Sequence, residues 1–175
     1  MKENYQIPPG TGIGHVHLKV ADLQRSLDFY CGLLGFNLMM KYGEDAAFIS
    51  AGGYHHHIGL NVWHSKNSPS APKNAPGLYH TAIKYPERID LANIYKRLLD
   101  KSYPLTGAAD HGVSEAIYLN DPDENGVELY YDRPQKEWPK DEEGKIIMFT
   151  HTLNLQNLLN YLNYEQENKK GNSRR

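Results

Sequence analysis

Hydrophobic and polar residues alternate over Gly14–Leu23, and this stretch predicts the first strand and the start of the first helix. Polar side chains fall on one face and apolar ones on the other: His15, His17 and Lys19 against Val16, Leu18 and Val20. A period of two is that of a β-strand with one buried face. Asp22 then predicts the N-cap of a helix, which ends at Gly35. The chain therefore opens with a strand–helix unit that carries histidine at the start of its strand.

The same pattern returns 65 residues later, which indicates an internal duplication. The matched pairs are His15 with His80, Leu18 with Ile83, Lys19 with Lys84, and Tyr30 with Tyr95. Further along, Ile58–Leu60 resembles Val127–Leu129. Each half predicts the order β-α-β-β-β. We therefore expect an α+β fold in which two βαβββ modules form a curved mixed sheet around a cavity, with the helices outside.

The predicted organisation is one domain over residues 1–134, followed by a C-terminal extension over residues 135–175. The modules cover residues 12–65 and 77–134, and the loop between them is rich in Ser, Pro, Lys and Asn. The remaining elements are expected as strands at 38–42, 46–50, 54–63, 116–119, 127–132 and 145–150, and helices at 90–101 and 154–164. Residues 106–114 are expected as a polar segment, and residues 166–175 as disordered.

Composition and charge narrow the function classes. The formal net charge is −2, and no basic run favours nucleic acid or a membrane surface. No apolar run is long enough to span a bilayer, and residues 1–9 lack the apolar core of a signal peptide. Cys31 is the only cysteine, so no internal disulfide is possible. These features predict a cytoplasmic protein whose partners are small molecules.

Three residues on the strands of the two duplicated modules predict a metal site. His15 and His80 hold equivalent points of equivalent strands, and strands that pair about a pseudo-twofold axis bring such points together. Glu128 lies on the last strand of the second module, with its side chain opposite Val127 and Leu129. Two imidazoles and one carboxylate are the facial triad that binds Fe(II) and leaves open positions. Taken singly, His15 and His80 are more simply explained as buried, hydrogen-bonded histidines and Glu128 as a solvated surface acid. The three together, at duplicated positions, favour the metal site.

The ordered motifs resemble the vicinal oxygen chelate superfamily, which holds glyoxalase I, fosfomycin-resistance enzymes, bleomycin-binding proteins and extradiol ring-cleaving dioxygenases. The resemblance covers roughly residues 12–134 and rests on His15–Leu23, Phe29–Tyr30, Leu34–Phe36 and Asp121–Leu129. It implies a divalent metal, Fe(II) or else Mn(II) or another ion, held by His15, His80 and Glu128.

Finer features resemble the extradiol branch, and the short proteins similar to catechol 2,3-dioxygenase in particular. That branch carries a histidine in the setting of His56–Leu60, which implies that His56 is the acid/base residue. It carries another histidine in the setting of His111–Ser114, and a tyrosine ten residues before the metal glutamate, here Tyr118. The resemblance therefore implies that His111 and Tyr118 hydrogen-bond the substrate oxygen. Strict strand alternation instead turns His57 towards the cavity, so His57 is the alternative to His56.

The implied reaction is cleavage of a small aromatic diol by O₂. The alternatives are a glyoxalase-like metal isomerase or lyase, and a non-catalytic dimer that binds small molecules. Gly59 is the counterpart of Glu128 in the first module, where similar glyoxalases place an acidic ligand, and glycine offers no side chain. His17 departs from the extradiol pattern, which often has an uncharged amide there. An open sheet edge and the leucine stripe of the predicted last helix favour a homodimer, with the site formed within one chain.

Overall fold

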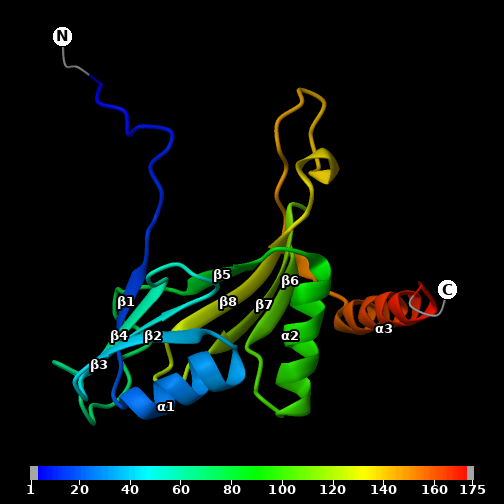
Figure 1. The fold of residues 1–175 in the computed structure, drawn as a ribbon. Helices are drawn as coiled ribbons and strands as arrows, with labels where there is room; N and C mark the ends of the chain where they lie inside the picture. Colours follow the sequence, from blue (N-terminus) through cyan, green and yellow to red (C-terminus); the bar gives the residue numbers. More distant parts are fainter. Residues whose placement is uncertain (1–3, 173–175) are drawn as a thin grey trace. The chain divides into compact units, whose positions relative to one another are not determined.

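The computed structural model describes residues 4–172, and its contacts divide the chain into two compact units. The first unit extends to Pro69 and the second begins at Ser70, so the division falls within the predicted loop between the modules. Each unit contains one module with its own mixed sheet (Figure 1). The α+β class and the duplicated module are confirmed. The hydrogen bonds place the strands in two sheets, one for each module, where the prediction had one curved sheet.

The first unit is a four-stranded sheet in the order β1-β4-β3-β2, in which only β1 and β4 run parallel. Its elements are β1 (Val16–Lys19), α1 (Leu23–Leu27), the π-helical segment η1 (Asp28–Leu33), β2 (Asn37–Tyr42), β3 (Ala46–Ser50) and β4 (Ile58–Asn61). The Asp22 side chain accepts a hydrogen bond from the Arg25 backbone N–H at 3.0 Å, which confirms the predicted N-cap.

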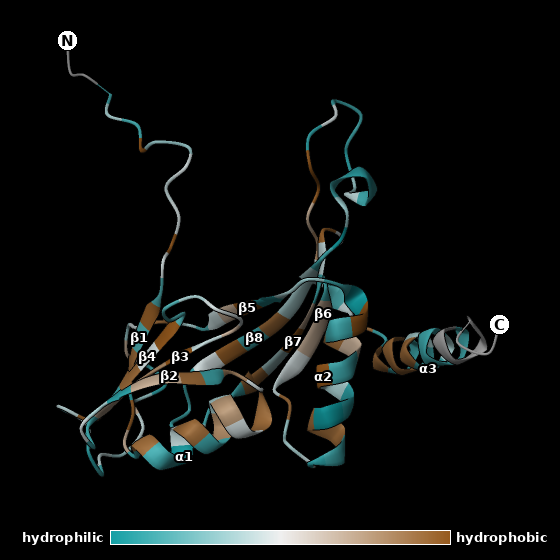
Figure 2. Ribbon diagram, in the orientation of Figure 1, coloured by the Kyte–Doolittle hydropathy of each residue, from teal (hydrophilic) through white to brown (hydrophobic). Residues whose placement is uncertain are grey.

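The alternation that opened the sequence is present in β1. Leu18 and Val20 are buried, whereas His17 and Lys19 are exposed. Leu23 and Leu27 of α1 are buried as well. In Figure 2 apolar residues recur along α1 and α2 between polar ones, as expected for helices that cover one face of a sheet. Burial of this apolar face leaves the histidine-bearing face of β1 available for chemistry.

The second unit is a five-stranded sheet in the order β5-β8-β7-β6-β9, and β5 runs parallel to β8. Its elements are β5 (Thr81–Tyr85), α2 (Arg88–Asp100), β6 (Gly107–Asp110), β7 (Ser114–Asn120), β8 (Gly126–Asp132), the 3₁₀ turn η2 (Gln135–Glu137), β9 (His151–Thr152) and α3 (Leu155–Asn172). No helix among the described residues is both long and apolar enough to cross a bilayer.

Four predicted boundaries are wrong. The strand expected at 54–63 is only β4, Ile58–Asn61, so the three neighbouring histidines precede it. The polar segment expected at 106–114 contains β6, which forms because β7 and β9 pair with its two edges. No strand covers 145–150; the chain makes a single bridge between Lys140 and Ile146 and then β9. The last helix continues to Asn172 instead of ending at residue 164, and residues 173–175 lie outside the described part.

The C-terminal extension packs as part of the second unit. Leu158 and Leu162 of α3 are almost completely buried, which gives the predicted leucine stripe its partner within the chain. Arg88 of α2 donates to the Asn157 side chain at 3.1 Å and lies 4.8 Å from the centre of the Tyr161 ring. Strand β9 pairs with the edge of β6. The organisation as a single domain with an appended extension stays a prediction.

Candidate metal centre

His80 and Glu128 form the centre of the candidate site in the second unit. His80 immediately precedes β5, and Glu128 lies on β8 directly opposite Ala82 in the parallel pair. The His80 Nε2 atom lies 2.9 Å from Glu128 Oε2, and the side chains are 31% and 13% exposed. The second module thus brings together two of the three predicted metal ligands.

Gly126 explains how His80 comes so close to β8. A Cβ atom on Gly126 would collide with the Tyr79 carbonyl oxygen and would lie 3.0 Å from the His80 Cβ. Glycine is therefore needed at the start of β8, where the residues just before β5 approach it closely. The turn before Gly126 is fixed by Asp121, whose Oδ1 accepts from the Asp123 and Asn125 backbone N–H groups at 2.8 and 2.9 Å. The predicted turn thus helps to position the His80–Glu128 pair.

Tyr118 and His111 extend the pair into a chain of hydrogen-bonding groups. Tyr118 lies opposite Glu128 in the β7–β8 register, and its hydroxyl is 3.2 Å from Glu128 Oε1. The His111 Nε2 atom lies 2.7 Å from the same hydroxyl. Burial and then the Glu128 charge raise the pKa of Tyr118 to about 12, so the phenol stays protonated near neutral pH. The structure brings these two predicted residues together with Glu128.

His15 and His56 are neighbours in the first unit. Their ring centres are 4.5 Å apart, and the His56 ring lies 5.0 Å from that of Phe48. Desolvation and then the charge of His15 lower the pKa of His56. His57 turns elsewhere, since its Nδ1 accepts from the Ala51 backbone N–H at 3.3 Å and lies 2.8 Å from Ser50 Oγ. Of the two alternatives, the structure brings His56 beside His15.

His17 and Gly59 form a pair that the sequence did not reveal. They lie opposite each other in the β1–β4 register, as Ala82 and Glu128 do in the other module. A Cβ atom on Gly59 would lie 2.9 Å from the His17 ring. The imidazole therefore lies over the position where Glu128 has its side chain in the second module. Desolvation and the charge of His15 lower the pKa of His17.

The donor set of the second unit fits a divalent metal. Metal–ligand bonds of about 2.0–2.2 Å meeting near right or tetrahedral angles separate two donor atoms by about 3.0–3.5 Å, close to the contact between His80 and Glu128. Residues 4–172 contain no group of three or more His, Cys, Asp or Glu side chains that could hold a metal. His15 belongs to the other unit, so the complete triad stays a prediction.

The second ring nitrogen of His80, Nδ1, is buried without a hydrogen-bond partner among the described residues. Leaving a buried polar atom unpaired costs about 1–3 kcal/mol. The contact with Glu128 is thus the polar interaction that the structure gives this imidazole, and it directs Nε2 towards the carboxylate.

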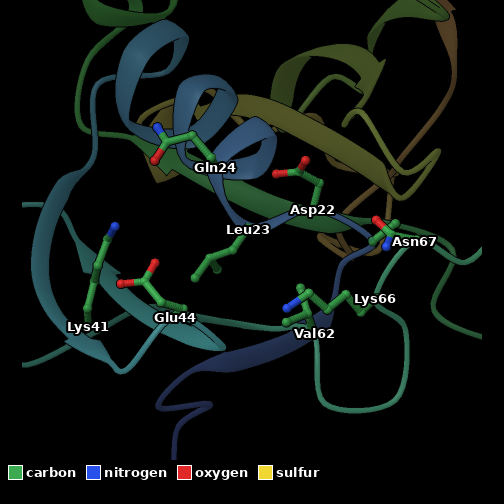
Figure 3. Close-up of a pocket in the computed structure, with 9 residues that line it drawn as sticks. Asp22, Leu23, Gln24, Lys41, Glu44, Val62, Lys66 and Asn67 are labelled. Atoms are coloured by element: carbon green, nitrogen blue, oxygen red, sulfur yellow. The ribbon is translucent and has the colours of Figure 1, made fainter.

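A hollow of about 250 Å³ lies on the α1 side of the first unit and is distinct from this site. Its lining mixes both charges, as Figure 3 shows for Asp22, Lys41, Glu44 and Lys66. The Lys66 Nζ atom lies 3.7 Å from Asp45. None of the predicted site residues lines this hollow.

The duplicated βαβββ module defines the class of protein to which the chain belongs. The family model of the Glyoxalase/Bleomycin resistance protein/Dioxygenase superfamily matches residues 12–129, and the chain belongs to this family. A glyoxalase/dioxygenase from Nostoc punctiforme shares the fold, with a TM-score of 0.60 and 18% identity over 75% of this chain and 99% of that one.

Two relatives come from different branches. Catechol-2,3-dioxygenase of Bacillus subtilis (strain 168) is 37% identical over 150 residues, which are 85% of this chain and 51% of that protein. A probable lactoylglutathione lyase of Synechocystis sp. (strain ATCC 27184 / PCC 6803 / Kazusa) is 27% identical over 70% of this chain and 97% of that protein. The chain thus spans about half the length of the dioxygenase that it matches.

Proposed function

We propose that the protein is an extradiol ring-cleaving dioxygenase that acts on a small aromatic diol and uses a divalent metal, with Fe(II) as the expected ion. One observation carries the proposal: the His80–Glu128 pair with Tyr118 and His111 lined up behind it. A carboxylate and an imidazole are the protein ligands of non-haem Fe(II) sites. The identity to catechol-2,3-dioxygenase supports the same branch.

His15, His80 and Glu128 would hold the metal, which supplies Lewis-acid activation of the two diol oxygens and of O₂. In the reaction the ring bond between one hydroxyl-bearing carbon and its neighbour without a hydroxyl breaks, and both atoms of O₂ enter the product. The chain's own residues then have to bind the diol, move its protons and stabilise charge on its oxygens.

His56 is the proposed acid/base residue. Its Nδ1 is 2.7 Å from His55 Nδ1, which leaves Nε2 as the nitrogen that exchanges a proton with the diol. Imidazole changes its charge near neutral pH and can accept a phenolic proton and return it later. His15 lies beside His56, so the proton transfer would take place next to the first proposed metal ligand.

Tyr118 and His111 are proposed to stabilise charge on the substrate oxygen. The Tyr118 hydroxyl adjoins Glu128, so it stands where a diol bound next to that carboxylate has its oxygen. His111 acts behind it, through the 2.7 Å contact with the hydroxyl. We further propose that the protein works as a cytoplasmic homodimer with each site within one chain.

The second candidate function is that of a glyoxalase-like metal isomerase, which the relative from Synechocystis favours. The His17–Gly59 pair argues against it, because glycine cannot supply the acidic ligand that similar glyoxalases have at this position. The test compares two assays on one metal-loaded sample. Ring cleavage of catechol with O₂ supports the dioxygenase. Isomerisation of the thiohemiacetal of methylglyoxal and glutathione, without ring cleavage, would establish the alternative.

A further inference from the structure

Arg133 immediately follows β8 and bonds to three residues around the turn that carries His111. Its Nη1 atom donates to Asp110 Oδ1 at 2.7 Å and to the Gly112 carbonyl at 2.9 Å. Its Nη2 atom donates to Asp110 Oδ2 and to Glu115 Oε1, each at 2.9 Å. One guanidinium therefore directs hydrogen bonds to both sides of His111 along the chain.

Hydrogen bonds within the turn hold the backbone of His111 itself. The His111 N–H donates to the Ser114 carbonyl at 2.9 Å. Gly112 takes a φ of +77°, and its N–H donates to Asp110 Oδ1 at 2.8 Å. Glycine supplies the left-handed conformation that the turn requires. Because Asp110 Oδ1 also accepts from the guanidinium, this carboxylate joins Arg133 to the middle of the turn.

Glu115 fixes the guanidinium from the interior of the second unit. Its side chain is only 6% exposed, and its Oε2 atom accepts from Arg88 Nε at 2.8 Å while Oε1 accepts from Arg133. Arg88 also donates to Asn157 and lies against the Tyr161 ring, both of α3. Charge-assisted hydrogen bonds of this kind are among the strongest in proteins. The carboxylate that receives Arg133 is therefore itself held in place by α2 and α3.

Strand β8 connects Arg133 to the candidate metal centre. Arg133 stands five residues after Glu128 on this part of the chain. The Tyr118 hydroxyl donates to Glu128 Oε1 at 3.2 Å, and the His111 Nε2 atom lies 2.7 Å from the same hydroxyl. The place of the His111 ring beside Tyr118 thus depends on a turn that is bonded to the end of the strand carrying Glu128.

The geometry requires a guanidinium and not only a positive charge. The four bonds leave two nitrogen atoms in one plane and reach oxygen atoms of three different residues. A lysine ammonium has three donors on a single nitrogen and cannot reproduce this fork. Arg133→Lys therefore keeps the charge beside Asp110 and Glu115 but gives up part of the hold on the turn.

We propose that Arg133 is a positioning residue, which holds the turn from Asp110 to Gly112 so that the His111 imidazole stays against the Tyr118 hydroxyl. This inference deepens the proposed function and rests on it for its catalytic consequence. The hold on the turn belongs to the second unit alone and can be measured without metal or substrate.

The first test is amide hydrogen exchange in the metal-free protein, followed by NMR. Arg133→Lys should speed exchange at the His111 and Gly112 amides about tenfold or more, because a lost hydrogen bond to a charged group shifts a local equilibrium by that much. Arg97→Lys makes the same change at an exposed arginine of α2 and should leave both rates unchanged. Asp110→Asn weakens the same contact from the other side and serves if Arg133→Lys does not fold. Wild-type rates at both amides in a folded variant would overturn the proposal.

The second test asks whether Arg133 acts through His111. In metal-loaded protein, Arg133→Lys should lower kcat for the diol about tenfold or more with little change in KM, because misplaced groups lose rate steeply. In a His111→Gln background the same change should have almost no further effect on kcat. An equal loss of kcat in both backgrounds would overturn the proposal, since a general loosening of the structure does not need His111.

The two tests also separate this inference from the proposed function. Should exchange quicken as expected while the metal-loaded wild type cleaves no diol, the proposed function fails and the role of Arg133 in holding the His111 turn stands. Should the wild type cleave the diol while Arg133→Lys keeps its exchange rates and its kcat, the proposed function stands and the inference about Arg133 fails.

Discussion

The Nε2 atom of His80 lies 2.9 Å from Oε2 of Glu128, and the two residues come from opposite ends of the second module's sequence. The parallel pairing of β5 with β8 makes this contact, and Gly126 allows the close approach. The geometry of this pair therefore depends on the pairing of the two strands, which hold the side chains rigidly.

Removal of either member of the pair should remove the metal. We expect His80→Ala and Glu128→Ala to retain little divalent metal after dialysis, because two ligands remain of three. Metal content by plasma emission spectroscopy is the measurement. His64→Ala, at an exposed histidine of the predicted loop, is the matched control and should keep the wild-type content. Full metal in His80→Ala would refute the triad.

His56→Phe should keep the metal and lose turnover, since the side chain serves proton transfer and not ligation. Such catalysis typically contributes about 10²–10⁴-fold, and the loss of kcat should fall in that range. His57→Phe is the control, because His57 bonds Ser50 and Ala51 instead of approaching His15. A rate loss in His57→Phe with none in His56→Phe would transfer the role to His57.

Much of the fold could be predicted from the sequence, because hydrophobic periodicity and an internal repeat indicate its elements. The alternation in β1 and the 65-residue repeat indicated both modules, with His80 at the start of the second and Glu128 on its last strand. Tyr118 and His111 came from the family resemblance instead, and the segment that holds His111 was not expected to contain a strand. Strand β6 could not be predicted, since Gly107–Asp110 has no apolar alternation and forms only because both neighbours pair with it.

The missed site features have physical reasons as well. The conflict between His56 and His57 arose from a strand assumed to begin too early; β4 begins at Ile58, so alternation does not apply to the histidines. The contact of the Phe149 carbonyl with His111 was missed because a backbone carbonyl has no signature in the sequence. Arg133 was missed too, because it lies 23 residues after Asp110 and no spacing in the sequence indicates the ion pair.

Gly59→Ala should destabilise the fold through His17. The added Cβ would lie 2.9 Å from the imidazole, and overpacking of this kind costs about 1–3 kcal/mol. In a His17→Ala background the same change should be nearly neutral, and urea unfolding of the four proteins gives the coupling. Gly53→Ala is the control, because its Cβ would meet no atom within 4 Å. Equal costs in both backgrounds would contradict the close approach of His17.

The Asp110–Arg133 ion pair should make the free energy of unfolding depend on pH. The hydrogen bond from Arg133 lowers the pKa of Asp110 despite its partial burial. A group with a lowered folded-state pKa contributes its full stability above the unfolded pKa of about 3.9, and loses it as pH falls through the folded value. Asp110→Asn should therefore cost about 1–3 kcal/mol at pH 7 and much less at pH 3, as measured by denaturant unfolding. A cost that does not change with pH would contradict the ion pair as its source.

The proposed activity is cleavage of an aromatic diol with O₂. The most direct measurement loads the protein with Fe(II) without air, adds catechol, and then admits O₂ while absorbance and oxygen are recorded. The account predicts a yellow ring-fission product, one O₂ consumed for each catechol, and neither signal in Glu128→Ala. Catechol that stays intact in fully metal-loaded wild-type protein would contradict the account.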